Sequence, residues 1–436
     1  MPTSAPPSAP PRPRIVVFGR EVHWPARFGD PTASWVTPVA IYVATRIMAA
    51  VFLIQGASRQ IAMTETTAAY TVKFPTPANP GYWTVTHNWD GQWYKSIALN
   101  GYPLHLPMVG DTVQQNEWAF YPLFPGLVRA IMELSAGRIG FNVAAPLLAT
   151  LCGGVAMIVL HRMLLETAGR FVAAATVLCV CLYAAAPIMQ VAYTESMAMM
   201  FITLVLYQLR VRNYAFAAAL SVPLSLTRGI APAMAIAMGL YWLLRWWHRK
   251  DRAFERVEQV KLAALTLFVG ALSGVWPLIV DMVTGHQNAF LETQRAWKVN
   301  ADRALFNNWW QRIEVYYGPI AATLIMAAVL PLLIVLFRKA TRVWGLELRA
   351  WALAYAIYLF LVTSPGSSTV RFVLLILAPL WPFPDPVPHG PEEMAHRRRR
   401  IVILVILSGI GIVAQYLFIT EVFTLPVPPG SGRPYP

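Results

Sequence analysis

Apolar stretches of membrane-spanning length alternate with short polar connections along most of this chain. The first runs from about Trp35 to Gly56, long enough to cross a hydrocarbon core of about 30 Å. Further apolar stretches lie at roughly 141–160, 171–190, 196–210, 213–227, 230–246, 260–283, 317–337, 349–364, 368–383 and 401–423. This pattern predicts an all-α, polytopic integral membrane protein with about eleven transmembrane helices.

The basic residues gather in alternate connections, which gives the chain an orientation. They lie at Arg162 and Arg170, Arg210 and Arg212, the run Arg245–Lys261, Arg338, Lys339, Arg342 and Arg349, and the run Arg397–Arg400. The positive-inside rule makes these connections cytoplasmic, together with a Pro- and Arg-rich disordered tail at 1–34. A single multi-span domain then covers 35–423 in the inner (plasma) membrane. Its first loop, 57–141, and the tail 424–436 are extracytoplasmic.

One apolar piece, 121–134, is too short to span and holds two prolines. We interpret it as a helix lying in the membrane interface, with further interfacial helix in the same loop. Counting it as a span would reverse every later connection and place the arginine runs outside. The charge pattern therefore argues against a span here.

Composition narrows the class of protein further. Hydrophobic residues make up 57% of the chain and charged residues 13%, which excludes an ordinary soluble domain. The net charge of +14 sits in short runs between apolar stretches, whereas a nucleic-acid-binding protein would cluster it on a solvated domain. We therefore expect membrane lipids, and no nucleic acid, as partners of the basic runs.

The longest polar interval, His87 to Pro125, contains the best candidate for chemistry. Asp90 lies there between Trp89 and Gly91. A carboxylate among aromatic residues at a membrane surface is a typical catalytic environment. The structural alternative is an interfacial loop anchored by its aromatic side chains, with Asp90 capping a short helix.

The residues after Asp90 predict an amphipathic helix over 90–100. One side of it carries Trp93, Tyr94, Ile97 and Ala98, and the sequence Gly-Tyr-Pro at 101–103 ends it.

Three more polar residues lie at the outer ends of predicted spans: Glu195 in AYTES, Arg228 after SLT, and Arg371 in STVRF. In a bundle these residues and Asp90 are able to converge near one membrane depth. Each also has a structural interpretation. Glu195 suits a helix first turn, Arg228 a snorkelling position, and Arg371 an ion pair with Asp281 or another acid.

Two further polar features leave alternatives open. Arg46 lies near the middle of the first span and must have a partner, either a protein carboxylate or a ligand phosphate. His87, Asp90 and Asp111 form at most a loose metal site, because their spacing is not diagnostic. The chain has no phosphate-binding Gly motif, and no cofactor is predicted.

Several motifs of the chain resemble those of a known family and occur in the same order. NWDGQWYKSIALNGYP is similar to the WD-containing first outer loop of the PIG-V-type (GPI mannosyltransferase-like) enzymes, and FYPLFPGL to the aromatic-proline segment after it. YTESMAMMFITLVLYQLR with PLSLTRG resembles their Glu-Ser helix and Leu-Thr-Arg turn, and RFVLLILAPLW their Arg-initiated late helix. The Pro-rich leader and the Arg-rich, Lys-poor composition look bacterial, and bacteria make no GPI anchors.

The resemblance implies a C-type glycosyltransferase, an enzyme that takes a sugar from a polyprenyl-phosphate donor outside the membrane. It implies mannose as the sugar, inversion at the anomeric carbon, and a glycolipid or glycan acceptor. Asp90 matches the catalytic acid of the family. For substrate binding we expect His87, Trp89, Tyr94, Tyr121, Glu195, Arg228 and Arg371.

Two other functions remain open on the sequence. A secondary transporter or lipid flippase also uses intramembrane charges, but usually near the midplane and in both halves of a repeat. A third possible function is that of a scaffold subunit in an envelope-assembly complex.

Overall fold

Helices form most of the structure, a computed structural model that describes residues 15–17, 20–22, 35–66, 71–250, 252–297, 309–310, 314, 320, 338–363, 366–383 and 393–426. The α-helices are α1 (Thr37–Ala57), α2 (Tyr82–Val85), α3 (Asp90–Asn100), α4 (Leu123–Leu134), α5 (Phe141–Leu182), α6 (Glu195–Arg210), α7 (Tyr214–Ser225), α8 (Ala231–Trp247), α9 (Arg256–Leu272), α10 (Val275–Thr284), α11 (Ala289–Trp297), α13 (Gly345–Val362), α14 (Ser367–Val373) and α15 (Glu393–Leu417).

The remaining elements are short. Two antiparallel pairs of strands occur, β1 (Ile15–Val17) with β2 (Arg20–Val22) and β3 (Met108–Val109) with β4 (Thr112–Val113). The 3-10 helices are Glu117–Ala119, Ala186–Gln190, Lys339–Trp344, Leu374–Ile376 and Ala378–Leu380, and a π-helical turn, Phe418–Phe423, follows α15.

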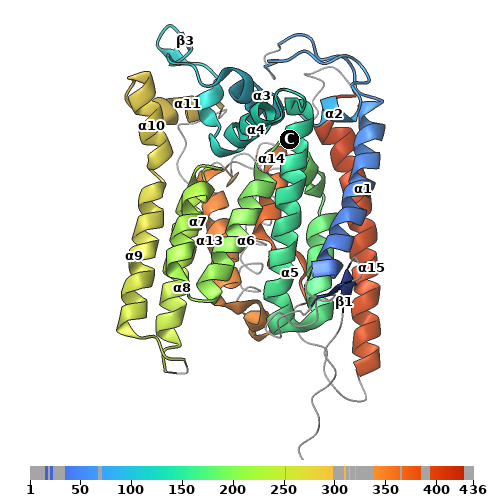
Figure 1. Cartoon of the computed structure of the whole chain (residues 1–436), viewed down its shortest axis with the longest axis vertical. Coiled ribbons are helices and arrows are strands. Elements are labelled where there is room, and N and C mark those ends of the chain that lie inside the picture. Colours follow the sequence, from blue (N-terminus) through green and yellow to red (C-terminus); the bar gives the residue numbers. More distant parts are fainter. Residues whose placement is uncertain are drawn as a thin grey trace, which may run out of the picture.

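Five helical segments in the described part are long and apolar enough to cross a membrane. They are Thr37–Ala57, Phe141–Leu182, Arg256–Thr284, Ala340–Val362 and Met394–Phe423. The long helices lie side by side along one axis (Figure 1). The prediction of an all-α, polytopic membrane protein is therefore confirmed.

Small residues bring the central helices together. Ala233 and Ala237 of α8 and Ala350 and Ala354 of α13 are fully or almost fully buried in one apolar core. Alanine lets helix backbones approach closely, which is the usual basis of helix packing inside a membrane.

The 42-residue α5 contains two helices joined at Gly169. Its length at 1.5 Å per residue is about 63 Å, roughly twice a hydrocarbon core. Gly169 has φ 83° and ψ 173°, a conformation that glycine adopts without a steric penalty. Gly169 lies between the predicted spans 141–160 and 171–190. The second of these spans is shorter than predicted, because α5 ends at Leu182.

Other predicted spans differ from the structure. The stretch 368–383 is not one helix, because α14 ends at Val373 and two 3-10 turns follow around Leu377, whose φ is 68°. Helix α7 has 12 residues, too few for a hydrocarbon core of about 30 Å. The predicted spans 213–227 and 368–383 therefore do not correspond to full-length helices, because hydropathy does not show where a helix breaks. The predicted span 317–337 and the tails 1–34 and 424–436 lie largely outside the described residues.

Arg46 is buried in α1, and its partners are backbone carbonyl groups. Its guanidinium donates to the oxygens of Ala186, at 2.5 Å, and Cys181, at 3.0 Å. Cys181 lies in the last turn of α5, and Ala186 begins the 3-10 helix that follows, so Arg46 ties α1 to the backbone on both sides of the turn between them. No carboxylate among the described residues pairs with Arg46. Its contacts with backbone carbonyls give this buried charge a structural role.

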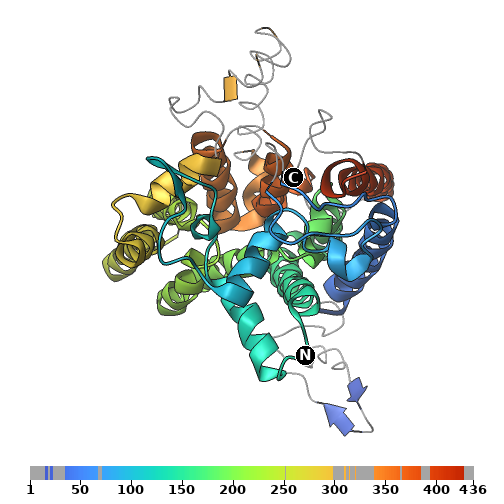
Figure 2. The ribbon, with the colours of Figure 1, turned by 90° about the horizontal axis from the view of Figure 1, so that it is seen from above.

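The polar loop folds over one end of the bundle. Helices α3, α4, α11 and α14 gather there, whereas the basic connection between α8 and α9 lies at the opposite end (Figure 1). Seen from above, α3 and α4 run across the bundle helices (Figure 2). The predicted helix at 90–100 coincides with α3, and Trp93, Tyr94, Ile97 and Ala98 are all buried. This end of the bundle carries the candidate site.

Candidate active site

The backbone turns sharply just before Asp90. Trp89 has φ 56°, an unusual value for a residue with a large side chain, and strain of this kind concentrates at functional sites. Its buried indole donates to the Phe423 carbonyl oxygen at 2.5 Å, which fixes the turn. Next to it, a Cβ atom on Gly91 would lie 3.3 Å from the His87 Cβ, which is tighter than ordinary van der Waals contact. Glycine thus lets the start of α3 pack closely against His87.

Asp90 begins α3 and pairs with an arginine from the other end of the sequence. Its Oδ2 lies 2.5 Å from Nη2 of Arg371 in α14. The Asp90 side chain is 22% exposed, whereas that of Arg371 is 6% exposed. A carboxylate in the first turn of a helix also gains from the helix dipole. The acid is therefore the accessible member of the pair.

Glu195 forms the second acidic position. Its Oε1 lies 2.8 Å from Nη1 of Arg228 and 3.6 Å from Nη1 of Arg371, and its side chain is 1% exposed. Arg371 thus bridges the two acids, and the proposed pairing with Asp281 does not occur. Asp281 instead accepts from the backbone N–H groups of Asn288 and Phe290.

Hydroxyl groups and aromatic rings complete this cluster. Thr194 Oγ1 lies 3.1 Å from the Tyr94 hydroxyl and accepts from Arg228 Nη1 at 3.3 Å. The Phe372 ring lies 4.5 Å from the Arg228 guanidinium, and the Tyr193 ring lies 5.0 Å from that of Arg371. Aromatic faces stabilise desolvated cations, so both arginines are held in place on more than one side.

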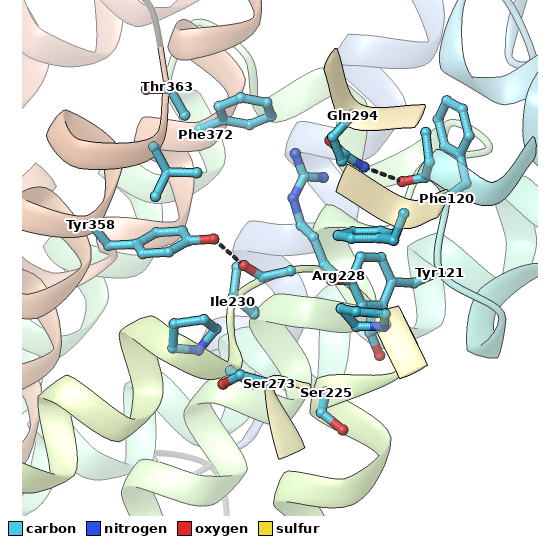
Figure 3. A pocket seen from close by; sticks show the side chains of 18 of the residues that line it. Phe120, Tyr121, Ser225, Arg228, Ile230, Ser273, Gln294, Tyr358, Thr363 and Phe372 are labelled. Atoms are coloured by element: carbon cyan, nitrogen blue, oxygen red, sulfur yellow. Dashed lines mark hydrogen bonds between the residues drawn. The ribbon is translucent and has the colours of Figure 1, made fainter. Parts of the chain in front are cut away.

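A cavity of about 390 Å³ opens onto the cluster. Asp90 and Arg228 line it, together with Tyr94 and Tyr121, and the Arg228 side chain extends among the other lining residues (Figure 3). Part of its apolar wall comes from residues of α9, α10 and α13: Leu272, Pro277, Leu359 and Val362. One cavity therefore joins an acid and a cation to an apolar surface.

The predicted site residues divide into three groups. Asp90, Tyr94, Tyr121 and Arg228 line the cavity. Glu195 and Arg371 lie behind it and hold the lining charges. His87 and Trp89, also expected to bind substrate, are both buried, and neither lines this cavity.

Burial controls the titration of the neighbouring groups. It raises the pKa of Tyr94 and of Tyr121 well above the ordinary phenol value, so both remain protonated hydroxyls. Burial also lowers the pKa of His87 to about 4, helped by the nearby charge of Lys95. His87 is consequently neutral at pH 7, and its Nδ1 has no hydrogen-bond partner among the described residues.

Several cavity residues carried no signal in the sequence. Tyr355 and Tyr358 face the cavity from α13, Gln294 from α11 and Phe372 from α14. The Tyr358 hydroxyl donates to the Gly229 carbonyl oxygen, and the Gln294 amide to that of Ala119 at 3.1 Å (Figure 3). The spacing of Tyr355 and Tyr358 places them on one helical face, but that is also the pattern of core packing.

The loose metal site does not form among the described residues. No group of three or more His, Cys, Asp or Glu side chains there is close enough to hold an ion. Asp111 is exposed in the turn between β3 and β4, whereas His87 is buried beneath α3.

Comparison with known proteins gives matches to solved structures only. No protein-family model and no curated protein matches the chain. Its fold is similar to ArnT from Cupriavidus metallidurans bound to undecaprenyl phosphate, with a TM-score of 0.47, 15% identity, and coverage of 88% of this chain and 65% of that one. It is also similar to the archaeal oligosaccharyltransferase AglB from Archaeoglobus fulgidus, in complex with an inhibitory peptide and a dolichol-phosphate, with a TM-score of 0.43, 9% identity, and coverage of 87% and 55%.

The chain spans less than two thirds of the length of either structure. The activity of this chain therefore has to be inferred from its own site.

Proposed function

We propose that this protein is a membrane glycosyltransferase that moves a sugar from a polyprenyl-phosphate donor to a glycolipid or glycan acceptor. The observation that carries the proposal is the cavity of about 390 Å³ into which Asp90 and Arg228 both face. Transfer from a sugar phosphate needs a base for the acceptor hydroxyl and a cation for the departing phosphate. Asp90 and Arg228 supply these two groups.

The reaction follows from the positions of these groups. The Asp90 carboxylate takes the proton of the acceptor hydroxyl as its oxygen attacks the anomeric carbon. The bond from that carbon to the phosphate oxygen breaks, and polyprenyl phosphate leaves with one more negative charge than it had in the donor. Arg228 stabilises that charge, because its guanidinium lines the cavity and is held by Glu195 and Thr194. A single displacement inverts the configuration.

Arg371 has a different role in this proposal. It is buried, does not line the cavity, and lies 2.5 Å from Asp90. We assign it the positioning of the base, and we assign the phosphate contact to Arg228. The sequence had left this choice open between the two arginines.

The apolar wall supports a lipid-linked donor. Leu272, Pro277, Leu359 and Val362 lie in the same cavity as the charged groups, so a phosphate and its hydrocarbon chain are able to bind together. Mannose is the proposed sugar on the sequence resemblance. The extracytoplasmic side is proposed from the basic connections at the opposite end of the bundle.

The transporter alternative gains no support from the site. Asp90 begins α3 and Arg371 lies in α14, and both helices are toward one end of the bundle (Figure 1). A cysteine at position 90 in an intact cell should react with an impermeant reagent from the outside only, whichever ligand is present. Exposure that alternates between the two sides would favour transport.

Reconstitution tests the proposal directly. The purified protein in liposomes should transfer labelled mannose from polyprenyl-phosphate mannose to a glycolipid extract of the native envelope, and it should not use a nucleotide sugar. Comparing envelope glycolipids and glycans by mass between a deletion strain and the restored strain identifies the product. Normal transfer from the nucleotide sugar, or identical glycolipids and glycans in both strains, would contradict the proposal.

A further inference from the structure

A second cavity, of about 490 Å³, lies beside α3 and carries a polar cluster separate from the Asp90 site. We call it the Glu117 groove. Its lining residues are Lys73, Phe74, Ser96, Asn100, Gly101, Tyr102, Pro103, Pro107 and Glu117. We propose that the Glu117 groove binds the uncharged sugar residues of a glycan acceptor. The acceptor role rests on the proposed function.

The centre of the groove is a nearly buried carboxylate. The Glu117 side chain is 9% exposed, and its Oε1 lies 2.8 Å from Ser96 Oγ and 3.0 Å from Lys73 Nζ. Among the described residues, both polar contacts of this carboxylate use Oε1. Oε2 is thus left to accept a hydrogen bond from a ligand. A buried ionised group needs such partners, because losing water is costly.

The charges of the groove favour a neutral ligand over an anion. Lys73 is already paired with Glu117, and its ammonium also lies 4.6 Å from the centre of the Trp93 ring. A phosphate in the groove would be attracted by the Lys73 ammonium and repelled by the adjacent Glu117 carboxylate. A hydroxyl group is able to donate to Glu117 and accept from Lys73 at once. Vicinal hydroxyls of a sugar fit this pair.

The remaining lining residues also suit a carbohydrate. Asn100 supplies an amide, which both donates and accepts, at the exposed end of α3. Phe74 and Tyr102 supply aromatic surface for the C–H faces of a sugar ring. Tyr102 is held in place, because its hydroxyl donates to the Phe120 carbonyl oxygen at 3.0 Å.

The position of the groove relative to Asp90 suggests an extended acceptor. Ser96 lies six residues after Asp90 on α3, a rise of about 9 Å. The 3-10 helix Glu117–Ala119 separates the two cavities, since Glu117 lines the groove and Ala119 lines the Asp90 cavity. Under this proposal, an acceptor of several sugar residues occupies both cavities, whereas a single sugar occupies only one.

Binding is tested without the donor, on the full chain in lipid nanodiscs free of maltoside detergent. Saturation-transfer difference NMR with α-mannotriose should show saturable binding. Glu117→Gln should weaken it at least tenfold, because a hydrogen bond to a charged group is lost. Asn100→Ala should weaken it about threefold to tenfold. Asn100 is exposed, so this second variant keeps the fold.

Glu133→Gln is the matched control, because Glu133 is an exposed acid on α4 outside the groove. Its binding should equal that of the unchanged protein. Inorganic phosphate at the same concentration should not displace the saccharide. No saturable binding, equal binding by all variants, or displacement by phosphate would overturn the groove as a site for neutral glycans.

The transfer assay separates this inference from the proposed function. Glu117→Gln should raise the KM for a mannotriose glycoside tenfold or more, and Asn100→Ala should raise it about threefold to tenfold. Neither variant should change the KM for a single-sugar acceptor or for the donor by much. Normal transfer with an unchanged KM would overturn the inference and leave the proposed function standing. Saccharide binding that the variants weaken, without any transfer by the unchanged protein, would refute the proposed function and the acceptor role together, with the groove kept as a glycan site.

Discussion

Asp90 and Arg371 are 281 positions apart in sequence, and their side chains meet at 2.5 Å between Oδ2 and Nη2. The same guanidinium lies 3.6 Å from Glu195, so one buried arginine faces two acids. Asp90 alone of these three residues lines the cavity. This arrangement holds the accessible carboxylate at a fixed place next to the substrate space, which is what a general base requires.

Arg371 should be needed for turnover more than for donor binding. Lysine keeps the charge but lacks the planar fork that spans Asp90 and Glu195, so Arg371→Lys should lower kcat tenfold or more with little change in the donor KM. Arg371→Ala should also destabilise the protein, by about 3–5 kcal/mol, because two acids lose a buried partner. Steady-state kinetics and thermal melting measure the two effects. A normal kcat for Arg371→Lys would remove its positioning role.

Arg228 should affect the donor KM more than kcat, the opposite of Arg371. Arg228→Lys loses bidentate contact with the phosphate, so the donor KM should rise tenfold or more. Arg129→Ala is the control, because Arg129 is an exposed arginine on α4 paired only with the exposed Glu133 among the described residues. Donor kinetics unchanged in Arg228→Lys and equal to those of Arg129→Ala would show that Arg228 does not contact the donor.

His87 should make the fold sensitive to acid. Its pKa is about 4 in the folded protein and about 6.5 when unfolded, so the unfolded state binds more protons between these values. Stability should therefore fall by roughly 3 kcal/mol as the pH drops from 6.5 to 4, at about 1.4 kcal/mol per pKa unit. His87→Phe should remove this part of the pH dependence of thermal melting. An identical pH profile in the variant would mean that His87 does not titrate in this way.

The orientation of the bundle is tested by reporter fusions. A reporter active only outside the membrane should work after Asp111, in the turn between β3 and β4, and fail after Lys250, in the connection between α8 and α9. Activity after Lys250 would reverse the topology and place the Asp90 cavity on the cytoplasmic side.

The sequence predicted the elements whose signal is local. Helix α3 was predicted to the residue, because an amphipathic pattern and a Gly-Tyr-Pro terminator mark both ends. The break at Gly169 was predictable, because a short polar interval separates the two apolar stretches there. The breaks after Val373 left no sign, because Leu377 adopts its unusual φ inside an uninterrupted apolar run.

The site was predictable only in part. Glu195, Arg228 and Arg371 stood out because they lie at the outer ends of predicted spans, and Asp90 stood out because it lies among aromatic residues in the longest polar interval. Their pairing depends on the packing of α3, α6 and α14, which hydropathy does not encode. Tyr355 and Tyr358 have the spacing of core residues, and Glu117 resembled any loop acid until Lys73 and Ser96 were found beside it.

The substitution Asp90→Asn tests the central claim most directly. Asparagine keeps the shape of the side chain but cannot take the proton of the acceptor, so turnover from polyprenyl-phosphate mannose should fall by about 10²–10⁴-fold. Donor binding and membrane insertion should change little, and Asp111→Asn, which changes an exposed acid in the β3–β4 turn, should transfer at the normal rate. Purified Asp90→Asn working at the unchanged rate would contradict the account and reduce Asp90 to a structural partner of Arg371.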